Sequence, residues 1–133
     1  MFLILASLLN FAISGLHIYI ITQGAWAYRY FGAGEQMARD AQKGSSTPAL
    51  VTFGIALVFF VWGLYALAGA RVIPELPWTR AILTVIAAIY VLRGVGVVIA
   101  PLFGVKLNSF LIVTSLVSLT AGLFHAAGLL TST

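Results

Sequence analysis

Four long apolar segments occupy most of this chain and restrict the folds open to it. A helix that rises about 1.5 Å per residue needs about 20 residues to cross about 30 Å of hydrocarbon. The 133-residue sequence holds four such segments, and 62% of its residues are hydrophobic. They run roughly over residues 2–22, 49–70, 79–101 and 109–130. The sequence therefore predicts a multi-pass membrane protein whose residues 1–133 form a single transmembrane domain.

The first connection, roughly residues 23–48, is the longest. Within it, residues 34–43 combine strong helix formers with a favourable spacing of four between Glu35 and Arg39. This stretch predicts a short helix lying near the membrane surface, with a solvated linker as the alternative. The two later connections are short, which makes consecutive spans antiparallel neighbours. The predicted fold is therefore an all-α, antiparallel four-transmembrane-helix bundle with a short interfacial helix in its first connection.

Cations on the connections indicate how such a bundle is oriented. The first and third connections share one side of the membrane and carry four of them, Arg29, Arg39, Lys43 and Lys106. The middle connection lies on the side of the termini and carries two, Arg71 and Arg80. Cytoplasmic connections of membrane proteins carry an excess of Lys and Arg. This distribution favours a cytoplasmic first connection, with both termini outside the cytoplasm.

Composition also excludes several kinds of chemistry. The chain has no cysteine, which excludes disulfides, thiolate catalysis and cysteine-ligated metals. Its Lys and Arg residues are scattered over the connections and form no basic stripe with interleaved aromatic residues, so nucleic acid is not an expected partner. No paired carboxylates at membrane depth, Ser/His/Asp set or phosphate-binding loop is recognisable. We therefore assign no catalytic residue, metal site or cofactor, and an enzyme is the least favoured class of function.

Apart from Arg80 at the very start of the third segment, Arg93 is the only charged residue inside the four apolar segments, and ionisable groups at membrane depth are costly and often functional. It lies about eight residues, or about 12 Å along a helix, from Pro101 on the side of the first connection. A carboxylate of that connection is within reach if the connection folds back over the bundle. The candidates for this ligand or ion-pair site are Arg93, His17, Tyr19, Tyr90, Glu35 and Asp40. In the alternative interpretation, the Arg93 stem lies along its helix while the guanidinium reaches lipid headgroups.

A second set of polar residues follows one face of the last apolar segment. Thr114, Ser118, Ala121 and His125 recur at helical spacing, and Ser118 also begins an overlapping stripe of small residues. Small and hydroxyl residues let two membrane helices approach closely, so one interpretation is a packing seam. The other is the polar wall of a ligand or water cavity. The candidates for that cavity are His125, Trp62, Tyr65, Ser118 and Thr114.

Two short motifs resemble those of a known group of proteins. His17-Ile18-Tyr19 stands near the end of the first segment, and Leu92-Arg93-Gly94-Val95-Gly96 lies in the third. With these motifs the chain resembles uncharacterised small bacterial proteins that span the inner membrane four times. The resemblance implies a multi-pass protein of the bacterial inner membrane, with periplasmic termini if the orientation above holds. It implies no particular activity.

Two classes of function fit these features better than catalysis. The first is a small integral membrane protein that binds a lipid-like or small apolar ligand or a membrane partner, because this needs only a cavity and a few polar anchors. The alternative is a channel or transporter for a small solute. Four spans are few for a pore, so this alternative implies a homo-oligomer. A continuous polar path through Arg93, or along Thr114, Ser118 and His125, would distinguish it.

Overall fold

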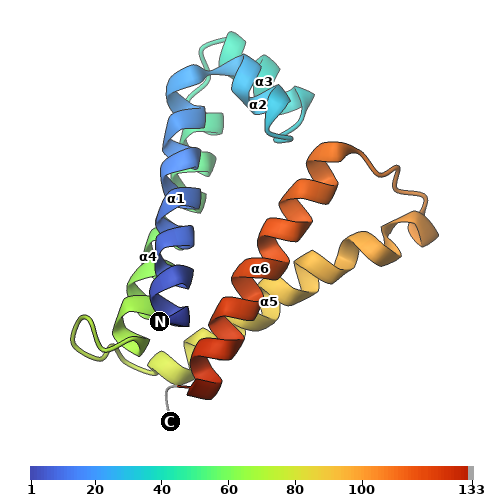
Figure 1. The fold of residues 1–133 in the computed structure, drawn as a ribbon. Helices are drawn as coiled ribbons and strands as arrows, with labels where there is room; N and C mark the ends of the chain where they lie inside the picture. The colour runs from blue at the N-terminus through green and yellow to red at the C-terminus, as the bar shows by residue number, and fades with distance from the viewer. Residues whose placement is uncertain (132–133) are drawn as a thin grey trace. The chain divides into compact units, whose positions relative to one another are not determined.

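The computed structural model describes residues 1–131, and within that range every regular element is a helix (Figure 1). The elements are α1 (Phe2–Gln23), α2 (Ala25–Tyr30), α3 (Glu35–Gln42), α4 (Thr47–Gly69), α5 (Thr79–Ile99), the 3₁₀ helix η1 (Ala100–Phe103) and α6 (Ser109–Thr131). Helices α1, α4 and α6, and α5 together with η1, are long and apolar enough to cross a membrane. This confirms the predicted all-α fold with four long apolar helices, as in a multi-pass membrane protein.

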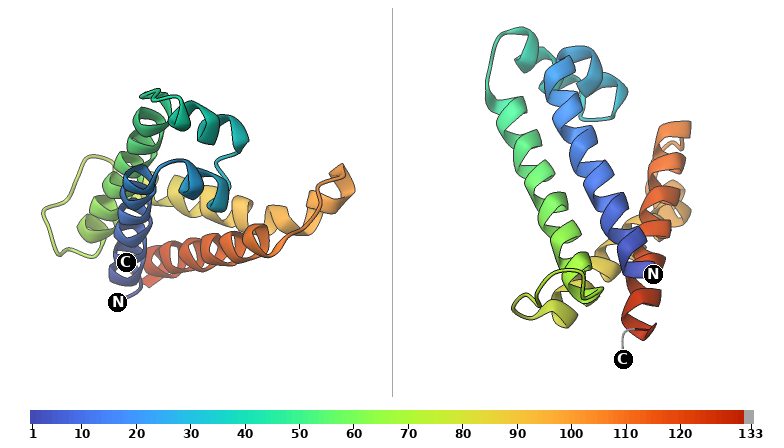
Figure 2. Two further views of the ribbon diagram at one scale, coloured as in Figure 1. Left: turned by 90° about the horizontal axis from the view of Figure 1, so that it is seen from above. Right: turned by 60° about the vertical axis from the view of Figure 1, so that its left-hand side comes forward.

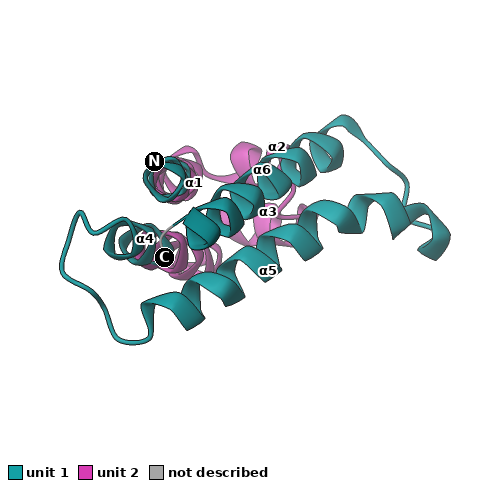
Figure 3. Ribbon diagram, turned by 60° about the horizontal axis from the view of Figure 1, so that its bottom comes forward, with its two compact units in different colours: residues 1–9, 62–133 teal, residues 10–61 magenta. Residues whose placement is uncertain are grey.

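The chain divides into two compact units, which are described separately (Figure 3). Unit 1 comprises Met1–Leu9 and the chain from Trp62 onward, and unit 2 comprises Asn10–Val61. Unit 1 thus contains α5, α6, the beginning of α1 and the end of α4. Unit 2 contains the remainder of α1 and α4 together with α2 and α3. The single transmembrane domain stays a prediction.

In unit 2, α1 and α4 lie side by side and run in opposite directions (Figure 2). The rings of Phe11 and Phe60 are 5.4 Å apart. Three residues further along α1, the Ser14 hydroxyl donates a 2.7 Å hydrogen bond to the carbonyl of Ala56, which precedes Phe60 in α4. The residue number of the contact increases along α1, from 11 to 14, while it decreases along α4, from 60 to 56. This is the pattern of two antiparallel helices. A buried hydroxyl bonded to a carbonyl of the facing helix is a common link between membrane helices.

The first connection folds into two short helices, where the sequence predicted one. The predicted helix is α3, and the aromatic stretch before it forms α2. Both begin after glycines with positive φ, 72° at Gly24 and 98° at Gly34, a conformation that glycine adopts without steric cost. Ala27 and Tyr28 of α2 are buried in one cluster with Ala38 of α3. Burial of these side chains against each other explains why so short a segment is helical.

In unit 1, Leu3 occupies the point where the long helices meet. It is 3% exposed, and a side chain built at Gly69 of α4 or Gly128 of α6 would collide with it. Leu83 of α5 is at the same point, since it too would meet a side chain at Gly69. The absence of side chains at these two glycines therefore makes room for Leu3 between neighbouring helices.

Arg71 closes α4 in a conformation that favours glycine. The N–H groups of Arg71 and Val72 donate to the carbonyls of Ala68 and Leu67, at 3.0 Å each. This is the Schellman motif, in which the residue after the helix end is left-handed and usually glycine. Here that residue is Arg71, with φ of 58°, a conformation that costs an L-residue about 1–2 kcal/mol. A glycine at position 71 would therefore be expected to make the protein more stable than the arginine does.

Candidate functional site

The contact between α5 and α6 is built on two glycines. A Cβ at Gly94 would lie 2.8 Å from the backbone nitrogen of Leu119, and a Cβ at Gly122 would lie 2.9 Å from that of Val91. No side chain fits into such a separation, so each glycine is in direct contact with the backbone of the other helix. Gly122, a member of the stripe of small residues on α6, therefore lies in a close helix–helix contact, as its size permits.

Beside this seam, Arg93 of α5 is bonded to Ser118 of α6. The guanidinium Nε donates to the Ser118 hydroxyl oxygen at 3.1 Å. Ser118 is 5% exposed, whereas Arg93 is exposed. Within residues 1–131, both ion pairs belong to Glu35, and neither includes Arg93. The bond to Ser118 thus fixes one edge of a cationic group that, within the described residues of unit 1, forms no ion pair.

Three rings lie in a row in unit 1, with Tyr90, three residues before Arg93 on α5, in the middle. The ring of Tyr90 meets that of Trp62 edge to face, with centroids 5.3 Å apart. It also stacks on the ring of His125, with centroids 5.6 Å apart. His125 is fully buried, and its Nδ1–H donates to the Ala121 carbonyl at 2.8 Å. The space between Trp62 and His125 is therefore occupied by Tyr90.

The structure thus joins members of the two predicted groups. Arg93 and Tyr90, assigned to one site by their depth, contact Ser118 and His125, assigned to the other. Tyr65 and Thr114 make other contacts. The Tyr65 hydroxyl donates to the Pro77 carbonyl at 3.3 Å, and the Thr114 hydroxyl donates to the Leu111 carbonyl at 3.2 Å within its own helix.

The predicted carboxylates of the first site bind partners inside unit 2. Glu35 accepts hydrogen bonds from Arg29 Nε at 2.9 Å and Arg29 Nη2 at 3.0 Å, and one from Arg39 Nε at 3.3 Å. The bond from Arg29 is the main cause that lowers the pKa of Glu35 below its usual range. Asp40 accepts from the Gln36 side chain at 3.0 Å. The pairing of either carboxylate with Arg93 stays a prediction.

His17 and Tyr19, the remaining candidates of that site, also belong to unit 2. Nδ1–H of His17 donates to the Ile13 carbonyl at 2.8 Å, and its ring lies 5.3 Å from that of Phe59. Tyr19 is exposed on α1. His17 is therefore held by its own helix and by an aromatic neighbour on α4.

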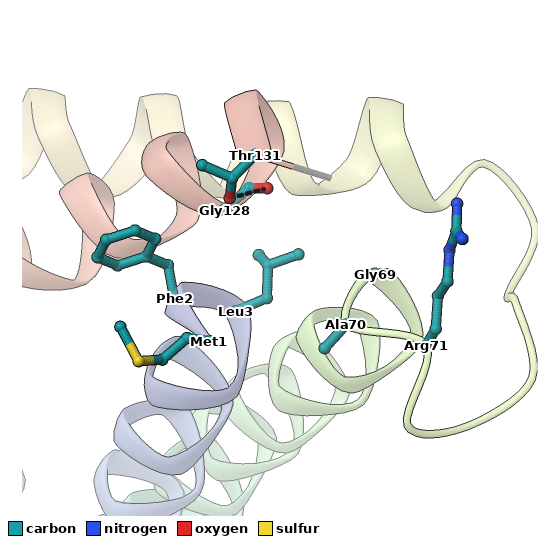
Figure 4. A pocket seen from close by; sticks show the side chains of 8 residues that line it. All are labelled: Met1, Phe2, Leu3, Gly69, Ala70, Arg71, Gly128 and Thr131. Carbon is teal, nitrogen blue, oxygen red and sulfur yellow. Dashed lines mark hydrogen bonds between the residues drawn. The ribbon is translucent and has the colours of Figure 1, made fainter. Parts of the chain in front are cut away.

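A cavity that the sequence did not indicate lies in unit 1, where α4 ends and α5 begins, and its lining includes both charged and apolar residues. It has a volume of about 330 Å³ and is lined by the charged residues Arg71, Glu75 and Arg80. A second cavity of about 260 Å³ is lined by Arg71 together with Met1 and Phe2, and Figure 4 shows Leu3 and Gly69 between Arg71 and these two residues. In the sequence, only two arginines at the ends of a short connection could have indicated this cavity. Such arginines are common beside membrane spans, so they do not predict a cavity.

Comparisons with protein-family models, with curated proteins and with solved structures found no match for this chain.

Proposed function

We propose that this protein binds an anionic lipid-like ligand in the membrane, with Arg93 as the anchor for the acidic group. The observation that carries the proposal is the bond from Arg93 Nε to Ser118. It holds the guanidinium in place without neutralising it, and the two terminal nitrogens can donate to a second partner. A planar guanidinium suits phosphate and carboxylate groups because it donates two parallel hydrogen bonds to them.

The surface around Arg93 suits the apolar part of such a ligand. Leu92 is 72% exposed, and Ile89, Val95 and Leu116 are also exposed. A charged group among exposed apolar side chains is the arrangement expected for an amphiphile lying along α5 and α6. The aliphatic stem of Arg93 can follow α5 toward the headgroup region. The bond to Ser118 limits the orientations that the guanidinium can adopt.

The test is the affinity of the purified protein for phosphatidylglycerol in mild detergent, measured by native mass spectrometry. We expect Arg93→Gln to lower that affinity by about tenfold to a hundredfold, since hydrogen bonds to charged groups contribute about 1.5–3 kcal/mol. Ser118→Ala should lower it by less, because the charge remains and only its orientation is lost. Arg93→Lys should give an intermediate affinity, because the charge is kept without the planar donor pair.

Lys106→Gln provides the matched control, because it removes an exposed cation of the next connection. It should leave phosphatidylglycerol binding unchanged. Glycerol phosphate is the soluble comparison, and we expect it to bind far more weakly than the lipid. If Arg93→Gln binds phosphatidylglycerol as tightly as the unmodified protein, Arg93 is no anchor. If glycerol phosphate binds as tightly as the lipid, the ligand is a free anion.

We further propose that the protein lies in a bacterial inner membrane with its termini in the periplasm. The support is the distribution of cations, four on the side of the first connection and two on the other. The chain has no cysteine, so single cysteines report accessibility without background. In intact cells, an impermeant maleimide should label Glu75→Cys and leave Lys106→Cys unlabelled. The reverse pattern would contradict the orientation.

A further inference from the structure

The cavity between the end of α4 and the beginning of α5 has an amphipathic lining. Two arginines and one glutamate, Arg71, Arg80 and Glu75, line it together with apolar side chains that include Leu83 and Leu129. Within the described residues 1–131, none of these three charged groups takes part in an ion pair. A site of about 330 Å³ with unneutralised charges of both signs is suited to a ligand that carries both signs itself.

Both arginines stand at positions that local structure disfavours. Arg71 has a φ of 58° where the Schellman motif favours glycine. Arg80 lies in the first turn of α5, where the helix dipole is unfavourable to a cation. A residue in a locally unfavourable conformation or position points to a role beyond folding. Both arginines line one cavity, so a shared anion is the simplest such role.

We propose that this cavity binds the phosphoethanolamine headgroup of a membrane phospholipid. Arg71 and Arg80 contact the phosphate, Glu75 contacts the ammonium, and the acyl chains lie along the apolar part of the lining. Both arginines adjoin the ends of apolar helices, Gly69 of α4 and Thr79 of α5, which is the level of lipid headgroups. This site is separate from Arg93, so it goes beyond the proposed function.

Arg71→Gly is the informative variant, because it removes the cation and supplies the residue that the Schellman motif favours. In mild detergent, native mass spectrometry should show the affinity for phosphatidylethanolamine reduced at least tenfold. The thermal midpoint of the same variant should be unchanged or higher. Arg71→Lys, which keeps a cation, should retain more of the affinity. If Arg71→Gly binds phosphatidylethanolamine as the unmodified protein does, the proposal is wrong.

Glu75→Gln tests the ammonium contact. It should weaken phosphatidylethanolamine binding severalfold and leave phosphatidylglycerol binding at this cavity equal or stronger, so the preference between the two lipids falls. An unchanged preference would overturn the assignment of Glu75. Soluble phosphoethanolamine separates the two sources of the headgroup, and binding as tight as that of the lipid would overturn a lipid ligand. Lys106→Gln again serves as the control, with no expected change for either lipid.

Discussion

Replacing Gly94 with alanine should destabilise the protein, although alanine is the better helix former. The added Cβ would lie 2.7 Å from the Leu119 Cβ and 2.8 Å from its backbone nitrogen. A backbone atom cannot rotate away, so α5 and α6 must separate. Overpacking of this kind costs about 1–3 kcal/mol. The free energy of unfolding, measured by titration with a denaturing detergent, should fall by this amount, and phosphatidylglycerol affinity should fall with it because Arg93 and Ser118 move apart.

Gly96→Ala is the matched control for this prediction. It lies two residues further along α5, and a Cβ there would meet no heavy atom within 4 Å. Alanine should therefore be neutral or stabilise the helix, by up to about 1 kcal/mol. Gly122→Ala approaches the same contact from α6, so the double variant with Gly94→Ala should lose less than the sum of the two. Equal free energies of unfolding for Gly94→Ala and Gly96→Ala would contradict the direct contact between Gly94 of α5 and the backbone of α6.

The four long helices could be predicted from the sequence because a span depends only on the length and apolar character of one segment. Helix α2 could not be predicted in this way. It has six residues, too few to be stable alone, and it depends on burial of Ala27 and Tyr28 in one cluster with Ala38. That contact depends on two glycines with positive φ, Gly24 and Gly34, whose conformation the sequence permits but does not specify.

Some of the candidate residues contact each other in the structure, but in a grouping that the sequence did not indicate. Counting residues along a helix gives the depth of a residue in the membrane. By depth, Tyr90 was assigned to the site of Arg93, and His125 was assigned to a different site. Contact depends also on which faces of two helices meet. Tyr90 and Arg93, three residues apart on α5, both face α6 and reach His125 and Ser118 there. Gly94 and Gly122 determine which faces of α5 and α6 are in contact, because each lies against the backbone of the other helix. The sequence alone does not show this contact.

The cavity beside Arg71 was missed for a different reason. Arg71 and Glu75 belong to the connection between α4 and α5, in which Arg71 and Trp78 both have positive φ, and Arg80 follows it in the first turn of α5. This conformation is uncommon for residues other than glycine, asparagine and aspartate, so sequence rules argue against the turn that brings Arg71 and Arg80 to one cavity. Local rules of this kind fail most often where a strained residue has a function.

Tyr90→Ala should be among the most destabilising single substitutions in unit 1. Tyr90 is 3% exposed, and its ring fills the space between the rings of Trp62 and His125. Removal of a buried aromatic ring costs about 3–5 kcal/mol, because its contacts are lost and a cavity remains. The free energy of unfolding should fall by about that much. Tyr90→Phe, which keeps the ring, should lose at most the worth of one hydrogen bond, about 0.5–1.5 kcal/mol.

Trp62 supplies a direct optical measurement of the same change. The chain has three tryptophans, and the other two, Trp26 and Trp78, are exposed, so replacing both with phenylalanine leaves Trp62 as the sole indole probe. In that background Tyr90→Ala should shift the Trp62 emission, because its edge-to-face neighbour is gone. Tyr19→Ala removes an exposed tyrosine from α1 and should change neither stability nor emission. If Tyr90→Ala behaved like Tyr19→Ala, the three-ring row would not hold α4, α5 and α6 together in unit 1.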